Sequence, residues 1–339
     1  MALRPKKIND IRNILVIRLS SIGDIVLTTP VLRRLHAAYP EASIDYCIKS
    51  SYASLVKASP YLNNVYTSDA PPEGHYDIVV DLQNNLRSRS LQQSISFDRL
   101  YRYKKRNWKK LLLVRAGLDL FDTTESVVDR YMASFEGSAV TGDDKGCELW
   151  LNEDDRNYAA SVSDSDGLQL AVCFGANHLT KRYPPQKFAS VVERLVREFR
   201  LRVFLLGGAE DIPQAEEMLA AISPGSASRV MNLAGMTSLT ESAAVMDMCD
   251  AVLTNDTGLM HIASAFEKQL FVLFGSSVAQ FGFLPYNTPY ALFEVQDLKC
   301  RPCSHIGRDH CPKGHFRCMV DIAEQSVAEG ISDYFISIT

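Results

Sequence analysis

Short apolar runs alternate with stretches of helical spacing along most of the 339-residue chain. Short apolar runs between turn residues predict buried strands, and apolar residues at every third or fourth position predict helices. Strands are predicted at residues 14–19, 43–48, 76–82, 148–151, 168–174, 201–206, 230–233, 251–254 and 270–274. Helices are predicted at residues 25–39, 52–58, 87–95, 188–199, 212–222, 239–249, 259–266 and 323–336, the first of them interrupted by Pro30. This alternation is typical of βαβ units and predicts an α/β protein with parallel sheets.

A glycine-rich polar stretch at residues 136–146, EGSAVTGDDKG, interrupts the pattern and has the composition of a linker. The chain is long for one hydrophobic core and suits two. We therefore expect a doubly wound, Rossmann-like domain at residues 1–140 and a second one at residues 147–339. The two domains are expected to face each other across a central cleft.

Charge and composition narrow the function classes. The chain has 36 basic and 40 acidic residues and a net charge of −4, so it lacks the overall basic field of a nucleic-acid-binding protein. The beginning of the chain, MALRPKKINDIRN, is too polar for a signal peptide, and no stretch reaches the roughly 20 apolar residues of a membrane helix. We expect a cytoplasmic protein that binds anions locally.

The stretch AVLTNDTGLMHIASAF at residues 251–266 places the end of a strand directly before a helix. Such a junction leaves backbone N–H groups unpaired at the helix N-terminus, where they can hold a phosphate. Asp256, Thr257, Gly258 and His261 are expected around this cradle. In the alternative interpretation Asp256 or Thr257 only caps the helix and His261 is a core histidine.

A similar junction follows the first predicted strand, with Ser21, Gly23 and Asp24 in the turn SSIGD. Gly23 permits a close approach of the backbone to a ligand, and Asp24 is placed to act as a base at the carboxyl end of the sheet. The alternative is that Asp24 caps the helix that follows.

A third loop, GANHLTKRYP after residue 174, begins with a glycine and continues with polar and basic side chains. This composition suits an anion-facing loop, in which Lys181 would hold a phosphate as a point charge. An exposed lysine without a binding role is the alternative.

Residues 99–115 contain eight basic side chains interleaved with Tyr101, Tyr103 and Trp108. The segment would face an anionic acceptor or an anionic membrane surface. A solvated helix face explains the same charges. Nucleic acid is disfavoured, because no base-stacking motif accompanies them.

Several blocks follow one another along nearly the whole chain: RLSSIGDIVLTTPVLRRL, GANHLTKRYP, GGAED, LAGMTSL, TNDTGLMHIASAF and FVLFGSS. In order and spacing they resemble the signature blocks of the ADP-heptose:lipopolysaccharide heptosyltransferase family, glycosyltransferase family 9. The resemblance implies a GT-B fold of two Rossmann-like domains. The first would bind a lipid-linked anionic oligosaccharide acceptor and the second an ADP-sugar donor. It also implies transfer with inversion, no metal and no cofactor.

The resemblance assigns roles to individual residues. Asp24 falls on the catalytic aspartate, with Ser21 and Gly23 beside it on the acceptor side. Lys181 falls on the phosphate-binding lysine. The remaining donor-binding positions are Asn177 in the lysine loop, Glu210 at the ribose, Met236 at the adenine, and Asp256, Thr257, Gly258 and His261 around the pyrophosphate and sugar.

The assignment agrees with the chemistry of glycosyl transfer. The reaction needs a base for the acceptor hydroxyl and positive charge for the departing diphosphate. Asp24 would supply the first, and Lys181 with the helix N-terminus at residues 256–258 the second. The DxD motif of many metal-dependent glycosyltransferases is not found at a strand end, since Asp164-Ser165-Asp166 falls in a polar linker.

The sequence departs from the family pattern at Tyr183, where tryptophan is common, and at Ala176 and Asn177, where hydroxyl side chains are common. These changes leave the sugar and nucleotide open, so a GT-B transferase for another nucleotide sugar is an alternative. A nucleotide-sugar epimerase or hydrolase is a further alternative, and so is a non-catalytic sugar-nucleotide-binding protein. A lipid-linked acceptor also leaves open a peripheral contact with the cytoplasmic face of the inner membrane. In a GT-B protein the terminal helix, here residues 323–337, commonly crosses onto the first domain.

Four of the eight cysteines lie close together near the end of the chain as C-x2-C-x7-C-x6-C, at Cys300, Cys303, Cys311 and Cys318. Four thiolates can close a tetrahedral structural zinc site, but this spacing is not that of a standard finger. Reduced thiols that pack a loop near the donor site are the leading interpretation. The other four cysteines are expected to be free and buried.

Overall fold

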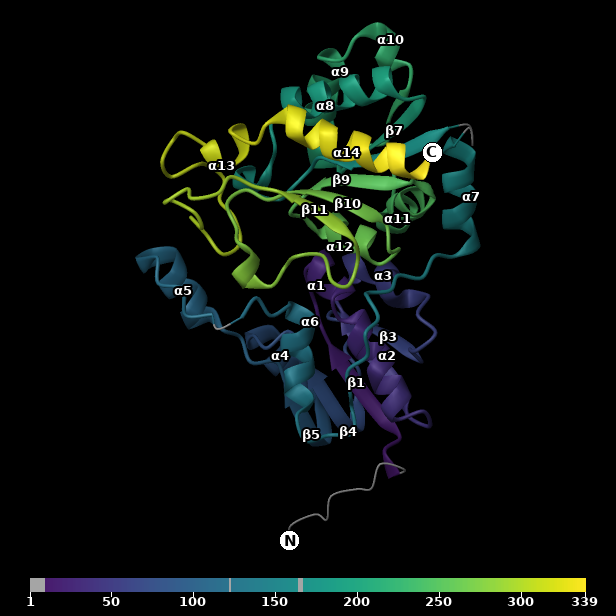
Figure 1. Ribbon diagram of the computed structural model, residues 1–339. Coiled ribbons are helices and arrows are strands. Elements are labelled where there is room, and N and C mark those ends of the chain that lie inside the picture. The colour runs from purple at the N-terminus through teal and green to yellow at the C-terminus, as the bar shows by residue number, and fades with distance from the viewer. Residues whose placement is uncertain (1–9, 122, 164–166) are drawn as a thin grey trace. The chain divides into compact units, whose positions relative to one another are not determined.

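The computed structural model describes residues 10–121, 123–163 and 167–339. It divides into two compact units: unit 1 comprises Met1–Arg106 and Glu125–Trp150, and unit 2 comprises Asn107–Thr124 and Leu151–Thr339. Each unit contains one parallel sheet with helices, which confirms the α/β prediction (Figure 1). The first nine residues of the chain and the Asp164-Ser165-Asp166 sequence lie outside the described residues.

Unit 1 has a five-stranded sheet in the order β3-β2-β1-β4-β5. All its neighbouring strands are parallel, and the central β1 places Ile14 opposite Ile44 and Ile78. The strands are β1 (Asn13–Ile17), β2 (Ser43–Ile48), β3 (Asn64–Thr67), β4 (Gly74–Asp81) and β5 (Ile95–Arg102). The helices are α1 (Ile22–Val26), α2 (Thr29–Ala38), α3 (Ser54–Lys57), α4 (Leu86–Leu91) and α6 (Val127–Met132), with 3-10 turns η2 (Ser50–Tyr52), η3 (Gln92–Ser94) and η4 (Ala133–Phe135).

Unit 2 has a six-stranded parallel sheet in the order β11-β10-β9-β6-β7-β8. The strands are β6 (Leu168–Cys173), β7 (Leu201–Leu206), β8 (Val230–Asn232), β9 (Ala251–Asn255), β10 (Gln269–Leu273) and β11 (Tyr290–Phe293). The helices are α5 (Asn107–Ala116), α7 (Glu153–Val162), α8 (Pro185–Glu198), α9 (Ile212–Ala220), α10 (Pro224–Ala227), α11 (Leu239–Met248), α12 (Gly258–Ser264), α13 (Arg317–Val320) and α14 (Glu324–Ile338). The 3-10 turns are η5 (Leu179–Lys181), η6 (Ala209–Asp211) and η7 (Ala279–Phe281). None of the helices in the described parts of the chain is long and apolar enough to cross a bilayer.

The apolar pattern explains the centre of the second sheet. Every residue of β9 is buried, because helices of a doubly wound fold cover both faces of a central parallel strand. On α8 the buried positions recur at helical spacing and pack into the core of unit 2 with Phe335 of α14. In Figure 1 the yellow α14 lies beside α8, and it also contacts β10. Its observed partners are thus in unit 2, and the expected crossing onto the first domain stays a prediction.

Several predicted elements are wrong in extent or kind. The helix predicted at residues 25–39 begins earlier, at Ile22, but its predicted interruption by Pro30 is confirmed, since α1 ends at Val26 and Pro30 stands in the first turn of α2. Residues 148–151 form no strand. The strands β3, β5 and β11 and the helix α7 were not predicted. All three strands lie at the edge of a sheet, and the pattern of β5, ISFDRLYR, is too polar to stand out.

The division into units also differs from the expected domain boundaries. Residues 141–150 belong to unit 1, where Asp143 binds Arg33 of α2 at 2.8 Å and Arg34 at 3.1 Å. Residues 107–124 belong to unit 2, where the ammonium of Lys110 lies 5.2 Å from the ring centroid of Phe283. The chain therefore passes between the units three times.

Candidate active site

The loops that follow β6, β7, β8 and β9 carry the predicted donor residues to one edge of the second sheet. These strands are neighbours in the order β9-β6-β7-β8, and all are parallel, so their carboxyl ends lie together. Two of the loops are tied directly, because the Gly235 N–H donates to the Gly207 carbonyl at 3.0 Å. The φ of Gly235 is +71°, a backbone conformation that favours glycine, and a Cβ there would also crowd Ile212 at 2.8 Å and the Ala209 backbone at 3.1 Å.

Lys181 and Asp256 form an ion pair at this edge. The ammonium nitrogen lies 2.7 Å from Asp256 Oδ2, and the same oxygen accepts a hydrogen bond from the Ser277 hydroxyl. Asp256 is buried, whereas Lys181 is partly exposed. The structure thus brings the two predicted phosphate-site residues together from loops 75 positions apart.

Thr257 is the N-cap of α12, and its hydroxyl accepts a hydrogen bond from the Leu259 N–H at 3.0 Å. Gly258 is the first residue of this seven-residue helix. The capping interpretation of Thr257 is therefore confirmed. His261 is buried, with its ring centroid 6.2 Å from that of Phe283. This burial fits a core histidine, and the roles of Gly258 and His261 in donor binding stay predictions.

The other predicted donor residues are exposed at the same edge. Asn177 lies in the loop after β6, and its amide nitrogen is 3.4 Å from His178 Nε2. Glu210 lies in η6, after β7. Met236 lies after β8 and is 69% exposed. A solvent-facing thioether and an exposed carboxylate on neighbouring loops offer an apolar and a polar contact to a nucleoside, and these contacts stay predictions.

Asp211 is a site residue that the sequence analysis missed. Its carboxylate accepts a hydrogen bond from the Gly208 N–H at 3.0 Å and lies 3.5 Å from Arg182 Nη2. Burial raises the pKa of Asp211, against the opposing effects of this hydrogen bond and of Arg182. A Cβ at Gly175 would meet Asp211 Oδ2 at 2.1 Å, so the loops after β6 and β7 pack through this carboxylate. The signal available in the sequence was Gly175 after β6, since a glycine at a strand end can indicate a close approach by another side chain.

In unit 1, Asp24 lies in the first turn of α1, directly after the loop that follows β1. Its Oδ2 accepts hydrogen bonds from the Ser21 N–H at 3.3 Å and the Ser21 hydroxyl at 3.0 Å. Asp24 is thus not the N-cap of the helix, as the alternative had it: Ser21 holds that position, and Asp24 is the third helical residue, whose carboxylate bonds back to Ser21 in a capping box. Gly23 is buried beside it. A role for Asp24 as a base stays a prediction.

Arg18 is the second missed residue. Its guanidinium lies 2.7 Å from Asp24 Oδ1 and also donates to the carbonyls of Ser20 at 2.8 Å and Leu82 at 2.6 Å. Burial lowers the pKa of Arg18, but Asp24, Tyr131 and Tyr46 together outweigh it and leave the pKa above its ordinary value. The sequence analysis treated this arginine as part of a strand, because it stands within an apolar run.

Gln83 fixes the loop between Arg18 and Asp24. Its buried side-chain oxygen accepts hydrogen bonds from the Leu19 N–H at 2.9 Å and the Ser20 N–H at 3.3 Å. Arg18 and Gln83 therefore hold the loop after β1 against the loop after β4. Both are positioning residues for Asp24. Arg18 opens the RLSSIGD block without a role assigned to it there, and Gln83 stands in no recognisable motif.

The basic segment at residues 99–115 is not one helix face. Arg99 and Arg102 belong to β5, whereas Lys109, Lys110 and Arg115 belong to α5 of the other unit. The solvated-helix interpretation of the whole segment is therefore wrong.

Lys105 lies between these two pieces, in unit 1. Burial lowers its pKa and the charge of Arg18 lowers it further, while Asp24 and Asp81 raise it. An ammonium group therefore lies in the electrostatic field of Asp24.

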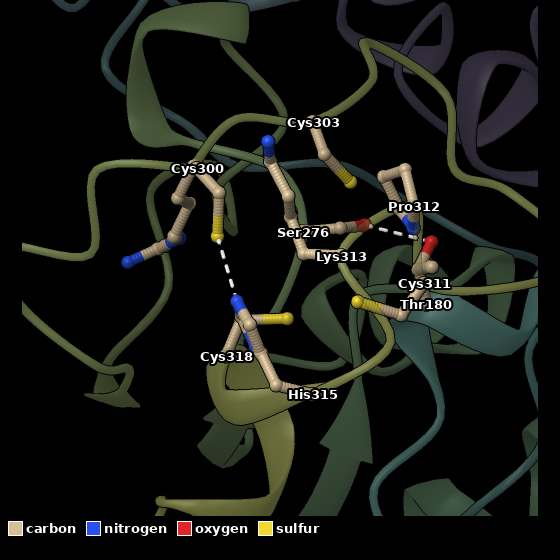
Figure 2. Close-up of a pocket in the computed structure, with 10 residues that line it drawn as sticks. Thr180, Ser276, Cys300, Cys303, Cys311, Pro312, Lys313, His315 and Cys318 are labelled. Atoms are coloured by element: carbon tan, nitrogen blue, oxygen red, sulfur yellow. Dashed lines mark hydrogen bonds between the residues drawn. The ribbon is translucent and has the colours of Figure 1, made fainter.

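The four clustered cysteines line a cavity at the edge of unit 2 (Figure 2). Their side chains face the same space, and Cys300 Sγ lies 3.7 Å from His315 Nε2. All eight cysteines are free thiols. Within the described ranges, a set of three metal-ligating groups within 4.8 Å of one another occurs at His75, Asp77 and Asp98 and not at the cysteines. This geometry favours reduced thiols over a preformed zinc site.

The cysteine loop is tied to the donor edge. The Thr180 hydroxyl accepts hydrogen bonds from the Arg308 N–H at 2.9 Å and from the Ser276 hydroxyl at 3.1 Å, the latter drawn in Figure 2. Arg301 donates to the Ser277 carbonyl at 3.0 Å. The loop thus supports the residues next to Lys181 and Asp256.

Comparisons with known proteins agree on the family. The family model described as Glycosyltransferase family 9 (heptosyltransferase) matches residues 72–312. Lipopolysaccharide heptosyltransferase 2 of Escherichia coli is 26% identical, over 94% of this chain and 97% of its own. Lipooligosaccharide heptosyltransferase 2 of Haemophilus influenzae is 25% identical, over 95% of this chain and 99% of its own.

Two solved structures share the fold. The structure of ADP-heptose LPS heptosyltransferase II of E. coli has a TM-score of 0.73 at 22% identity, over 96% of this chain and 99% of its own. A family 9 glycosyltransferase of Veillonella parvula has a TM-score of 0.77 at 19% identity, over 96% and 98% of the two chains. The predicted GT-B fold is thereby confirmed. With a family model that matches most of its length, this chain belongs to glycosyltransferase family 9, the heptosyltransferases.

Proposed function

We propose that this enzyme transfers a heptose from ADP-heptose to a hydroxyl group of the lipopolysaccharide inner core, with inversion and without a metal ion. The observation that carries the proposal is the Lys181–Asp256 pair at the edge where the loops with Asn177, Glu210 and Met236 also end. The names of the heptosyltransferase relatives support the donor and the acceptor class.

On the donor side, Lys181 stabilises the leaving group. An ammonium group has three N–H donors, so Lys181 can bind a phosphate oxygen while it keeps its contact with Asp256. When the bond between the anomeric carbon and the diphosphate oxygen breaks, negative charge develops on ADP next to this cation. The N–H groups at Thr257 and Gly258 add to the positive potential at the start of α12. Glu210 is proposed to bind the ribose and Met236 the adenine.

On the acceptor side, Asp24 takes the proton of the attacking hydroxyl as the new glycosidic bond forms. Arg18 favours the ionised carboxylate and fixes its orientation, while Ser21 holds the second oxygen. The ammonium of Lys105 attracts the anionic groups of a core oligosaccharide toward the same region. We propose that the enzyme works in the cytoplasm, at the membrane surface where a lipid-linked acceptor is located.

The test is Asp24→Asn, assayed by ADP release with purified donor and acceptor. We expect turnover to fall by about two or more orders of magnitude, since general-base catalysis commonly contributes that much. ADP affinity should be unchanged. The matched control is Ser21→Ala, which removes one hydrogen bond to Asp24 but keeps the carboxylate. Near-normal turnover in Asp24→Asn rules out the base.

The nucleotide is tested by thermal shift with ADP, UDP and GDP, because a ligand that binds the native state raises its melting temperature. Selective stabilisation by ADP is expected. Stabilisation by UDP or GDP instead would assign another nucleotide sugar. Consumption of ADP-heptose without acceptor would indicate a hydrolase or epimerase.

A further inference from the structure

We propose that the outer side of α5 and the turn after it dock this protein on an anionic lipid bilayer. The docking face consists of Trp108, Leu111, Leu118 and Leu120. The inference rests on the proposed function in one respect, since a lipid-linked acceptor brings the enzyme to a membrane. It goes further by assigning the contact to four side chains.

The exposure of these side chains is the first argument. Trp108 is 58% exposed, Leu111 48%, Leu118 53% and Leu120 40%. Single exposed apolar residues are normal on a soluble protein, but four large ones within 13 consecutive residues indicate an interaction surface. Trp108 and Leu111 are three positions apart on α5 and therefore lie on the same side of the helix.

The other side of α5 is held by unit 2. Leu113 is buried, and the Lys110 ammonium lies 5.2 Å from the ring centroid of Phe283 and 5.7 Å from that of Phe281. After the helix, the Gln280 amide donates to Asp119 at 3.1 Å. The segment is thus anchored through one side while the docking face stays in solvent. A surface that is anchored in this way pays little ordering entropy when it binds.

Charge identifies the partner as anionic. Residues 104–120 contain six basic residues and one acidic residue, in a protein whose net charge is −4. Arg115 is exposed on α5, and Lys109 stands beside Trp108, with its ammonium 5.8 Å from the ring centroid. Tryptophan and leucine that insert at the interface, flanked by lysine and arginine that meet lipid phosphates, are the combination that holds peripheral proteins on anionic membranes.

The experiment uses the full chain with two kinds of vesicle, one of phosphatidylcholine alone and one that also contains about 30% phosphatidylglycerol as the anionic lipid. The protein has two tryptophans, so Trp150→Phe leaves Trp108 as the single fluorescent reporter. We expect a blue shift of its emission and co-sedimentation with the anionic vesicles. Binding should weaken as salt is added.

Two variants test the residues. Leu111→Ser combined with Leu118→Ser and Leu120→Ser should lower the partition coefficient by about 10-fold or more, because less apolar surface inserts. Lys109→Gln combined with Arg115→Gln should lower it by about 25-fold, since each basic residue near the surface contributes about fivefold. The matched control is Leu86→Ser, on α4, where the side chain is 83% exposed. It should leave binding unchanged.

The inference is overturned if the protein binds neutral and anionic vesicles alike, or if the triple variant binds as the original protein does. It is also overturned if the triple variant changes the molecular mass in solution, because the face would then join copies of this chain. Activity on a delipidated acceptor separates the two proposals. If the protein transfers the sugar to this acceptor but does not bind vesicles, the proposed function stands and the docking proposal is rejected.

Discussion

The Lys181 ammonium lies 2.7 Å from the buried carboxylate of Asp256. Removal of the lysine leaves that carboxylate buried without this cation. For Lys181→Ala we therefore expect the free energy of unfolding to fall by about 2–4 kcal/mol, and ADP affinity to fall by about 10-fold or more. Chemical denaturation and calorimetric titration with ADP measure the two effects.

The double variant Lys181→Ala with Asp256→Asn separates stability from binding. It removes the buried charge together with its partner, so stability should largely return while ADP affinity stays low. If ADP binds Lys181→Ala as tightly as it binds the original protein, Lys181 is a structural ion-pair partner and not a phosphate ligand.

Gln83 should control turnover without contacting the donor. Gln83→Ala leaves the buried N–H groups of Leu19 and Ser20 without their acceptor, which costs about 1–3 kcal/mol of stability. The displaced loop should also lower kcat by about 10-fold or more, with ADP affinity unchanged. Gln83→Glu keeps an acceptor oxygen and should recover most of the turnover. If Gln83→Ala turns over as fast as the original protein, the loop needs no such support.

Asp143 should make stability depend on pH. The hydrogen bond from Arg33 holds the pKa of Asp143 well below its usual range, and Arg34 adds to the effect. A carboxyl group whose pKa is lower in the folded state stabilises the fold above its unfolded pKa of about 3.9, and this contribution is lost as the pH falls toward the folded pKa.

Asp143→Asn should therefore lower the free energy of unfolding by about 1–2 kcal/mol at pH 7, and by progressively less below about pH 4. Thermal melts at pH 7 and in acid measure the difference. Glu136→Gln, an exposed carboxylate in the same linker, should have little effect at either pH. If Asp143→Asn lowers the free energy of unfolding by the same amount at every pH, the ionisation of Asp143 is not linked to stability.

The cysteine cavity should react as a set of unequal thiols. Burial raises the pKa of Cys311, but hydrogen bonds from the N–H groups of residues 313–316 outweigh it and hold the pKa below its ordinary value. Burial raises the pKa of Cys318 to about 12. Iodoacetamide at neutral pH should therefore alkylate Cys311 before Cys318, as measured by peptide mass mapping. Two results together would overturn the reduced-thiol interpretation: stoichiometric zinc in elemental analysis, and cysteines that resist alkylation until a chelator is added.

The sequence predicted the second sheet well and the first less completely. The junction from β9 to α12 was found because a buried strand, turn residues and a helix follow one another within 16 positions. The edge strand β5 was missed because its mixed polar pattern resembles a loop or a helix. Apolar periodicity thus reveals central strands more readily than edge strands.

Predictions for the site divide in the same way. Motif residues such as Asp24 and Lys181 were identified, because glycines and strand ends surround them. Arg18, Gln83 and Asp211 were missed, since their importance comes from partners that only folding brings near. The pairing of Lys181 with Asp256 is a property of strand order, which local pattern does not encode.

The route of the backbone has a practical consequence for dissecting this enzyme. Since residues 107–124 are embedded in unit 2, neither half is a continuous stretch of chain. A fragment that starts at residue 147 would lack α5 and would uncover Phe281 and Phe283, where Lys110 now lies. Autonomous expression of unit 2 would require a circularly permuted or spliced gene rather than a simple truncation. Any rotation of one unit relative to the other must likewise change backbone torsion angles in all three segments that connect the units.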